Sequence, residues 1–330
     1  MDRKVVVLGG GTGTYTVLSG LKNYPLEITA IVSMADSGGS ARKERDEFGM
    51  LPVSDVRKAL LALAQEDGKG GLLRDLFNYR FSKGVGVEGT TFGNLFLVAL
   101  SSILGSQEKA IEEVARILGI KGQVLPVTLE ETNVVAEYDE GVTVVGEHFI
   151  DEPCHDARLG VRRIYLLPVP SANPKALSEI EKADAVVIGP GDLYTSLLPT
   201  LLVRGIEKSL KRSRAKKIYV LNLMSRFGQT NGFPASRYLA ELGEYLSFIP
   251  DYVLVNNASL PVDVLQHYAS FESSYPVEDD LREGLGYRVV RGDFLSRQTF
   301  SPQKGDKLKR SLLRHDSDKL AKVLTKVMGG

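Results

Sequence analysis

A glycine-rich turn near the start of the chain is the segment best suited to chemistry with a phosphate. The apolar run Val5–Leu8 leads into Gly9–Thr14 (GGGTGT), and a helical stretch follows. Glycines there permit a sharp turn and bring main-chain N–H groups close to an anion, towards which the helix points its positive end. The spacing is neither Walker A nor a complete G-x-G-x-x-G, because Thr14 stands in the last glycine position. The alternative is a structural turn without a ligand; we predict that the phosphates of a nucleotide-type ligand contact Gly9, Gly10, Gly11, Thr12 and Gly13.

A second polar loop follows the next strand-like run. Ile28–Val32 leads into Ser33–Ser40, which reads SMADSGGS. Ligands of open α/β sheets bind beyond the carboxyl ends of the strands, so Asp36 is placed to reach a ribose hydroxyl, a metal ion or the proton of a nucleophile. Asp36 is therefore the candidate catalytic residue and metal ligand, unless it only caps a turn. The residues after it form a second main-chain cradle for the ligand: Ser37, Gly38, Gly39 and Ser40.

The segment Pro52–Arg57 opens a helical stretch and carries two further candidates. Ser54 is placed to act as N-cap, and Asp55 lies in the first turn, where its charge suits the helix dipole. Asp55 and Arg57 are candidate ligand-binding residues, Arg57 through a phosphate. Each also has a structural explanation, since Asp55 suits the helix terminus and Arg57 can pair with a carboxylate.

A third polar loop, Gly189–Ser196 (GPGDLYTS), follows the apolar strand-like run Ala185–Ile188. A plain strand-to-helix turn needs one glycine, whereas two flank a proline here. We expect main-chain amides and hydroxyl groups of this loop to contact the ligand. Its candidate residues are Gly189, Gly191, Asp192, Tyr194, Thr195 and Ser196.

Two weaker candidates lie farther along the chain. Asn222 follows the strand-like run Lys217–Leu221 and can contact a base or a sugar, although asparagine is also a common turn residue. Near the end, Arg314–Asp316 precedes an amphipathic helical stretch. Asp316 is explained as its N-cap, and His315 beside it is a candidate base.

The elements that must position these loops alternate between strand and helix. Several strand-like runs are apolar throughout, as expected for strands covered on both faces of a parallel sheet. We predict an α/β fold: a Rossmann-like three-layer α/β/α core with a mostly parallel, doubly wound sheet. The strand-like runs are Lys4–Leu8, Ile28–Val32, Ile164–Val169, Ala185–Ile188, Lys217–Leu221 and Tyr252–Val255. The helical stretches are Tyr15–Lys22, Asp55–Gln65, Gly93–Leu104, Glu108–Leu118, Lys175–Lys182 and Ser236–Leu246.

One segment departs from this alternation. Asn133–Tyr138 and Val142–Glu147 alternate apolar and polar residues around a turn, which predicts a small added β-hairpin. We expect residues 1–330 to form a single domain, with the hairpin excursion at about 127–150 and a C-terminal helix at about 316–328.

Composition excludes several classes of protein. The 41 basic and 41 acidic residues give no net charge, and the basic segment Lys208–Lys217 is explained as a solvated helix face and turn, so no nucleic-acid partner is expected. The single Cys154 fits a reducing compartment, and the amino terminus does not read as a signal peptide. The most apolar helical candidate, Phe92–Leu104, is well short of a bilayer span. We expect a cytoplasmic protein without a membrane span.

Signatures of covalent catalysis are missing from the sequence. It contains no G-x-S-x-G, C-x-x-C or H-E-x-x-H. If chemistry occurs, the residues favour positioning of a phosphate ester beside a bound cation. No tightly bound organic cofactor is expected.

These loops together resemble the CofD-like family and, within it, the YvcK branch, whose members are called gluconeogenesis factors. The matching segments run in order over nearly the whole chain, which makes the set far more specific than any one motif. They are Gly9–Gly13, Asp36–Ser40, Asp46–Leu51 with Asp55–Arg57, Gly93–Leu95, Gly189–Ser196 with Pro199, Asn222–Met224 with Gly228–Thr230, and Arg314–Asp316 with Lys319–Leu320.

The resemblance implies a Rossmann-like core that is often dimeric, and adds Asn94 of the Gly93–Leu95 motif to the candidate ligand-binding residues. CofD itself transfers a phospholactyl group from a nucleotide-activated donor, with magnesium, so the resemblance implies Mg²⁺ as the cofactor of any such chemistry here. The YvcK branch is linked to gluconeogenic growth and cell shape and binds UDP-sugars. This sequence departs from the family where an Asp-Asp pair is replaced by Asp36-Ser37.

Three readings follow. The first is a regulatory protein that binds a nucleotide sugar of the UDP-N-acetylglucosamine type, as a homodimer. The second is a 2-phospho-L-lactate transferase of the CofD type, and the third is an NAD(P)-binding protein with Asp36 on a ribose hydroxyl.

Overall fold

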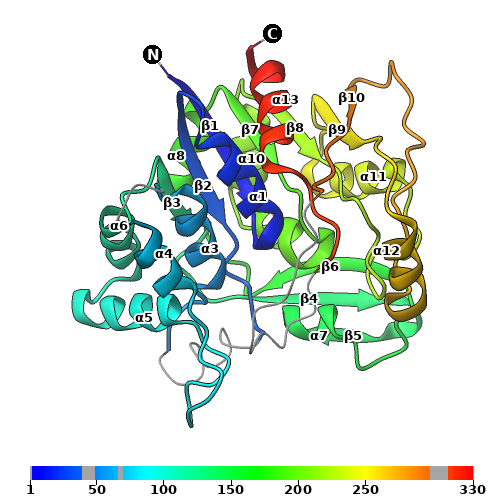
Figure 1. The fold of residues 1–330 in the computed structure, drawn as a ribbon. Helices are drawn as coiled ribbons and strands as arrows, with labels where there is room; N and C mark the ends of the chain where they lie inside the picture. The colour runs from blue at the N-terminus through cyan, green and yellow to red at the C-terminus, as the bar shows by residue number, and fades with distance from the viewer. Residues whose placement is uncertain (1, 39–48, 66–69, 298–310, 330) are drawn as a thin grey trace.

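Helices cover both faces of the central sheet, which is why its strands are apolar along their length. The computed structural model describes residues 2–38, 49–65, 70–297 and 311–329. These residues form a seven-stranded parallel sheet in the order β10-β9-β8-β7-β1-β2-β3 (Figure 1). Its strands are β1 (Arg3–Gly9), β2 (Leu26–Val32), β3 (Gln123–Pro126), β7 (Ala185–Ile188), β8 (Lys216–Val220), β9 (Tyr252–Asn256) and β10 (Arg288–Gly292).

The chain reverses its direction across the sheet between β1 and β7. It first moves outwards from β1 to β2 and β3, and later returns to place β7 on the other side of β1. Right-handed crossovers then put the helices of the two halves on opposite faces of the sheet. Such a reversal opens a crevice at the carboxyl ends of the two central strands.

The helices form the outer two layers. On one face α1 packs against both α3 and α13, and on the other α10 packs against α8 and α9. The three-layer α/β/α prediction is confirmed. The helices are α1 (Gly11–Leu21), α3 (Ser54–Leu63), α4 (Gly70–Asn78), α5 (Phe92–Leu104), α6 (Gln107–Ile117), α7 (Glu147–Asp151), α8 (Pro174–Lys182), α9 (Leu198–Leu201), α10 (Ile206–Arg212), α11 (Ala235–Leu246), α12 (Val262–His267) and α13 (Ser317–Gly329).

A separate antiparallel sheet lies below the carboxyl edge of the parallel one (Figure 1). It contains β4 (Asn133–Tyr138), β5 (Thr143–Val145) and β6 (Val161–Leu167) in the order β5-β4-β6. The predicted hairpin is thus present as β4 and β5, but it is part of a three-stranded sheet. The run Ile164–Val169, which we grouped with the parallel strands, belongs to β6 and pairs with β4.

Two helix termini differ in how they are capped. Asp316 accepts hydrogen bonds through Oδ1 from the main-chain N of Asp318 at 3.1 Å and of Lys319 at 3.0 Å, so its predicted role as N-cap of α13 is confirmed. The expectation for Ser54 is wrong, because α3 already begins at Ser54 and Val53 is its N-cap. Within the described ranges, no helix combines the length and apolarity needed to cross a bilayer.

Candidate functional site

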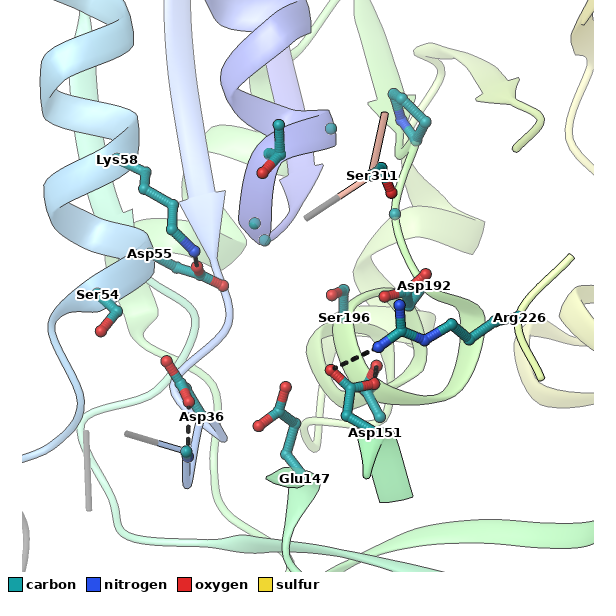
Figure 2. A pocket seen from close by; sticks show the side chains of 18 of the residues that line it. Asp36, Ser54, Asp55, Lys58, Glu147, Asp151, Asp192, Ser196, Arg226 and Ser311 are labelled. Carbon is teal, nitrogen blue, oxygen red and sulfur yellow. Dashed lines mark hydrogen bonds and ion pairs between the residues drawn. The ribbon is translucent and has the colours of Figure 1, made fainter. Parts of the chain in front are cut away.

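A cavity of about 500 Å³ lies at the carboxyl edge of the parallel sheet, at the crevice between β1 and β7. The loops that follow β1, β2, β7 and β8 all contribute to its wall, together with the start of α3, the helix α7 and the segment before α13. Figure 2 shows carboxylate and basic side chains pointing into this space from several of these elements. The size falls within the range of small-molecule sites.

The glycine-rich turn begins the wall of the cavity at the start of α1. Gly10 precedes the helix and offers no side chain to cap it, and the first turn carries no acidic residue. The N–H groups of this turn are therefore left for a ligand or solvent. Gly11 has φ of +67°, which favours glycine, and the space beside it is open except for Ser196 Oγ at 3.9 Å from an added Cβ.

The loop after β7 faces the start of α1. Gly191, Asp192, Thr195 and Ser196 line the cavity, and Leu193–Leu197 form one turn of π-helix. Thr195 Oγ1 donates a hydrogen bond to Asp151 Oδ1 at 3.1 Å, so its hydroxyl is engaged with α7. π-Helical turns occur often at functional sites.

The carboxylates of Asp36, Asp55 and Glu147 lie near one another at the cavity wall, and that of Asp55 lies beside Gly10. Burial raises the pKa of Asp36, and the charge of Asp55 raises it further, while Gly38 N donates to Asp36 Oδ1 at 2.9 Å. Burial and the charge of Asp36 also raise the pKa of Glu147 well above its usual value. Lys58 Nζ lies 2.8 Å from Asp55 Oδ1. Within the described residues the charges of these carboxylates raise the pKa of Asp36 and of Glu147, and a bound cation would lower both again.

A second cluster of charged and polar side chains lies around Asp151. Its Oδ1 accepts a hydrogen bond from Gln229 Nε2 at 2.6 Å, and its Oδ2 lies 3.8 Å from the Arg226 guanidinium (Figure 2). Burial raises the pKa of Asp192, although Arg226 opposes this shift. Burial alone would lower the pKa of Arg226, but the charges of Asp192 and Asp151 raise it. Arg226 is therefore a fixed positive charge on the cavity wall.

Arg57 is buried, with 6% exposure, and its side chain is held by neighbouring amides. Its Nε donates to Asn94 Oδ1 at 2.8 Å, and a terminal nitrogen donates to Asn78 Oδ1 at 3.0 Å. Asn94 Nδ2 in turn lies 3.3 Å from Ser54 Oγ. The Arg57–Asn94 pair joins α3 to α5 and presents its remaining surface to the cavity.

The structure brings most of the predicted residues together. Those that line the cavity are Gly10, Gly11, Thr12, Gly13, Asp36, Gly38, Asp55, Arg57, Asn94, Gly191, Asp192, Thr195, Ser196 and Asn222. Gly9, Ser37 and Gly189 lie in the same loops without forming part of the wall, and Gly39 and Ser40 fall outside the described residues.

Tyr194 is the clearest exception among the predicted residues. It is 1% exposed and absent from the cavity wall, and its hydroxyl lies near Glu241 of α11. Burial and Glu241 together raise its pKa. Tyr194 therefore belongs to the packing behind the loop.

Five acidic residues of the cavity wall were missed: Glu88, Glu147, Asp151, Glu152 and Glu272. Glu147 and Asp151 both lie on α7, four residues apart, and this spacing puts them on one side of the helix. The hairpin predicted from the sequence extends to Glu147, and nothing in the sequence indicates that the end of this hairpin lies against the parallel sheet. His148 N donates to Ser37 Oγ at 3.1 Å and fastens α7 to the loop after β2.

Among the described residues, no group of three or more His, Cys, Asp or Glu side chains is arranged to hold a metal ion. Mg²⁺, however, is commonly held by one or two carboxylates together with phosphate oxygens and water. Asp36 and Asp55 fit that donor set, so magnesium at Asp36 stays a prediction that requires a phosphate ligand.

Fold and site together define a Rossmann-type α/β protein with a polar cavity at the switch point of its sheet. The family model described as 2-phospho-L-lactate transferase CofD matches residues 5–295, so the chain belongs to the CofD family. Within it, relatives from Nostoc sp. and Thermotoga maritima are 42% and 41% identical over 99% and 98% of this chain, and cover 69% and 99% of those proteins.

A Bacillus subtilis protein named gluconeogenesis factor is 35% identical over 98% of this chain and 98% of its own length. Among solved structures, the crystal structure of protein BH3568 from Bacillus halodurans superposes with a TM-score of 0.89 at 36% identity, covering 98% of this chain and all of that one. The resemblance to the gluconeogenesis factors is therefore confirmed at the level of sequence and fold.

Proposed function

We propose that this chain is a regulatory protein of the gluconeogenesis factor type that binds a nucleotide sugar, with UDP-N-acetylglucosamine as the representative ligand. The observation that carries the proposal is the meeting of two glycine-marked loops around the start of α1, inside one cavity. The relatives named gluconeogenesis factor support the link to carbon metabolism. A role in cell shape and a homodimeric state belong to the same proposal.

The diphosphate is assigned to the start of α1. The N–H groups there are not capped by a side chain, and the helix dipole favours negative charge at this end. Ser196 and the main chain of Gly191 border the same space. The carboxylate of Asp55 lies beside Gly10 at the same helix start, where a Cβ built on Gly10 would clash with Asp55 Oδ2. A Mg²⁺ ion between phosphate oxygens and the carboxylates of Asp36 and Asp55 would offset the repulsion.

The sugar and the nucleoside are assigned to the part of the cavity lined by Asn222, Arg226 and His315. These side chains offer hydrogen-bond donors and acceptors that can bind the hydroxyl and amide groups of a ligand. The division into a phosphate end and a polar end matches the shape of a nucleotide sugar more closely than that of a free phosphate.

Binding to the intact protein tests the proposal directly. A ligand present at 100 times its Kd stabilises the folded state by about 2.7 kcal/mol, so UDP-N-acetylglucosamine should raise the Tm measurably. NAD⁺ and NADP⁺ serve as comparison ligands. A Tm that stays constant with saturating UDP-N-acetylglucosamine but rises with a dinucleotide would replace this proposal with the NAD(P) alternative.

Transferase activity is a second candidate, because the matching family model is that of 2-phospho-L-lactate transferase. The carboxylate of Asp36 on the cavity wall favours it. Its test is product formation from a nucleotide-activated phospholactate, magnesium and a deazaflavin alcohol. Turnover that falls by about 10² or more in Asp36→Asn, with nucleotide binding retained, would establish it.

A further inference from the structure

The main chain around His315 is held by hydrogen bonds to residues 294–296. His315 forms an isolated antiparallel bridge with Leu295, and the N–H of Asp316 donates to Phe294 O at 2.7 Å. Asp316 then caps α13. The main chain that carries the imidazole is therefore fixed by the fold before any ligand binds.

The imidazole is more than nine-tenths buried, with 8% exposure, and it lines the cavity. Burial lowers its pKa to about 4, against a hydrogen bond to the main chain of Leu221 that raises it. The ring is thus neutral at pH 7 and has one N–H. Because a main-chain group that favours the protonated ring is a carbonyl acceptor, the nitrogen facing Leu221 carries that proton.

The other ring nitrogen, Nε2, is consequently a lone-pair acceptor. Within the described part of the chain it has no hydrogen-bond partner, although it is shielded from solvent. The adjacent Asn222 presents a similar case, since its side chain lines the same cavity and its Oδ1 also has no partner there. Buried acceptors are normally paired, so two such atoms beside one cavity require an explanation.

A purely structural role for His315 explains the ring nitrogen that faces Leu221 but not the unpaired Nε2. The hydrogen bond to Leu221 and the bridge to Leu295 explain why a ring of this size is placed here. They do not explain why the second nitrogen of a side chain that lines the cavity is left as an unpaired acceptor. A phenylalanine would fill the space without the penalty of an unpaired nitrogen.

We propose that His315 Nε2 and Asn222 Oδ1 are two acceptors for the bound ligand's sugar, each receiving a hydrogen bond from a different hydroxyl group. The inference rests on the proposed function and deepens it, because it assigns the sugar-reading residues. His315 acts here as a binding residue in its neutral form. An anionic group is disfavoured at this position, because both acceptors would repel it.

Two substitutions separate the acceptor from the structural hydrogen bond. His315→Asn places an amide N–H near the position of Nδ1, so it can keep the bond to Leu221 while it removes the acceptor. His315→Gln reaches the position of Nε2 with an amide oxygen and restores an acceptor. His267→Asn is the matched control, since the His267 side chain is 47% exposed and does not line the cavity.

The probes are UDP-N-acetylglucosamine, UDP, 2′,3′-dideoxy-UDP and inorganic pyrophosphate, each titrated by calorimetry. The inference expects roughly tenfold weaker binding of UDP-N-acetylglucosamine to His315→Asn, near wild-type binding to His315→Gln and His267→Asn, and no change for pyrophosphate. A loss that also appears with UDP but not with the dideoxy compound assigns the ribose, and a loss confined to UDP-N-acetylglucosamine assigns the hexose.

Other results overturn the inference. Equal affinity of His315→Asn and wild type for UDP-N-acetylglucosamine removes the acceptor role but leaves the proposed function standing. A loss that persists with the dideoxy compound points to the base and contradicts a sugar hydroxyl. If wild type binds none of the nucleotides, both proposals fail.

The tautomer supplies a check that needs no ligand. Nitrogen chemical shifts of His315 in the labelled protein at pH 7 should show a proton on Nδ1 and a lone pair on Nε2. The opposite tautomer would overturn the inference even if nucleotides bind.

Discussion

The carbonyl oxygen of Pro190 occupies the position beside Gly13 where any other residue would have its Cβ atom. A Cβ built on Gly13 would lie closer than 3.0 Å to the oxygen and the carbonyl carbon of Pro190, which non-bonded atoms do not tolerate. The glycine-rich turn and the loop after β7 are therefore packed directly against each other. This contact, as much as any phosphate, explains why the turn contains glycine at this position.

Gly13→Ala should destabilise the protein. Alanine is favourable in a helix by itself, but here it forces the main chain of Pro190 away, and overpacking of this kind costs about 1–3 kcal/mol. The measurement is the urea midpoint of the variant against that of wild type.

Gly71→Ala is the control for this prediction. Gly71 lies in α4, and a Cβ built on it meets no atom within 4 Å. Alanine there should stabilise the protein by about 0.5–1 kcal/mol. Equal effects of the two substitutions would show that the Gly13–Pro190 contact is not rigid.

Gly11→Asp should abolish binding of a diphosphate while leaving the fold intact. The backbone of Gly11 has φ of +67°, a conformation that Asp and Asn tolerate better than most residues, and the space beside it is open. A carboxylate there would stand where we assign the phosphates. Affinity for UDP-N-acetylglucosamine should fall by about three orders of magnitude, as expected for like charges about 4 Å apart at the effective dielectric of a protein surface, where the repulsion is about 4 kcal/mol.

Gly11→Asn is the matched neutral variant. It has the same size and the same tolerance of the backbone conformation, so its affinity should fall much less. Similar losses in both variants would indicate that volume, not charge, excludes the ligand, and would argue against a phosphate at the start of α1.

Five of the seven parallel strands, β1, β2, β7, β8 and β9, were predictable because they contain apolar runs, and glycine marks the ends of β1 and β7, whereas β3 was not predicted. The antiparallel sheet was predicted only in part. Its third strand, β6, carries Arg162 and Arg163 on exposed positions, a pattern of one-sided burial that our assignment to the parallel sheet overlooked. Strand β10 was missed because its residues are only partly buried and include Arg288 and Arg291.

The residues of the cavity likewise fall into those that the sequence predicted and those that it did not. Residues in loops directly after parallel strands were found, because the topology brings strand ends together whatever the side chains are. Glu147 and Asp151 were not found, because they reach the cavity from a different sheet through a tertiary contact between His148 and Ser37. Tyr194 was included because it stands among hydroxyl residues, whereas the π-helical turn directs it towards α11.

Asp36→Asn should make the stability of the protein less sensitive to pH. The pKa of Asp36 is raised in the folded state by burial and by Asp55, so the folded protein binds a proton more readily than the unfolded chain. Its contribution is complete below the unfolded value of 3.8 and is lost as the pH rises through the folded value. Asparagine keeps the hydrogen bond from Gly38 without the charge, so the variant should gain stability over wild type between pH 4 and pH 8.

The same variant tests the role of magnesium. If Mg²⁺ joins the diphosphate to Asp36, magnesium should strengthen binding of UDP-N-acetylglucosamine to wild type, and this gain should shrink roughly tenfold or more in Asp36→Asn. Calorimetric titrations with and without magnesium provide the comparison. An unchanged gain would remove Asp36 from the metal site.

His315 should make the protein more stable at neutral pH than at acid pH. Its pKa is about 4 in the folded state, below the ordinary value of 6.5, so the folded protein binds this proton less readily than the unfolded chain. The contribution is complete above pH 6.5 and is lost as the pH falls towards 4. The difference of 2.5 units corresponds to about 3 kcal/mol, since each unit is worth about 1.4 kcal/mol. Gln at position 315 cannot take up this proton. The measured quantity is the free energy of unfolding of wild type minus that of His315→Gln, and it should fall by this amount as the pH is lowered from 7.5 to 4. Other titrating groups cancel in that difference, and a value independent of pH would mean that the ring is charged or exposed in the folded protein.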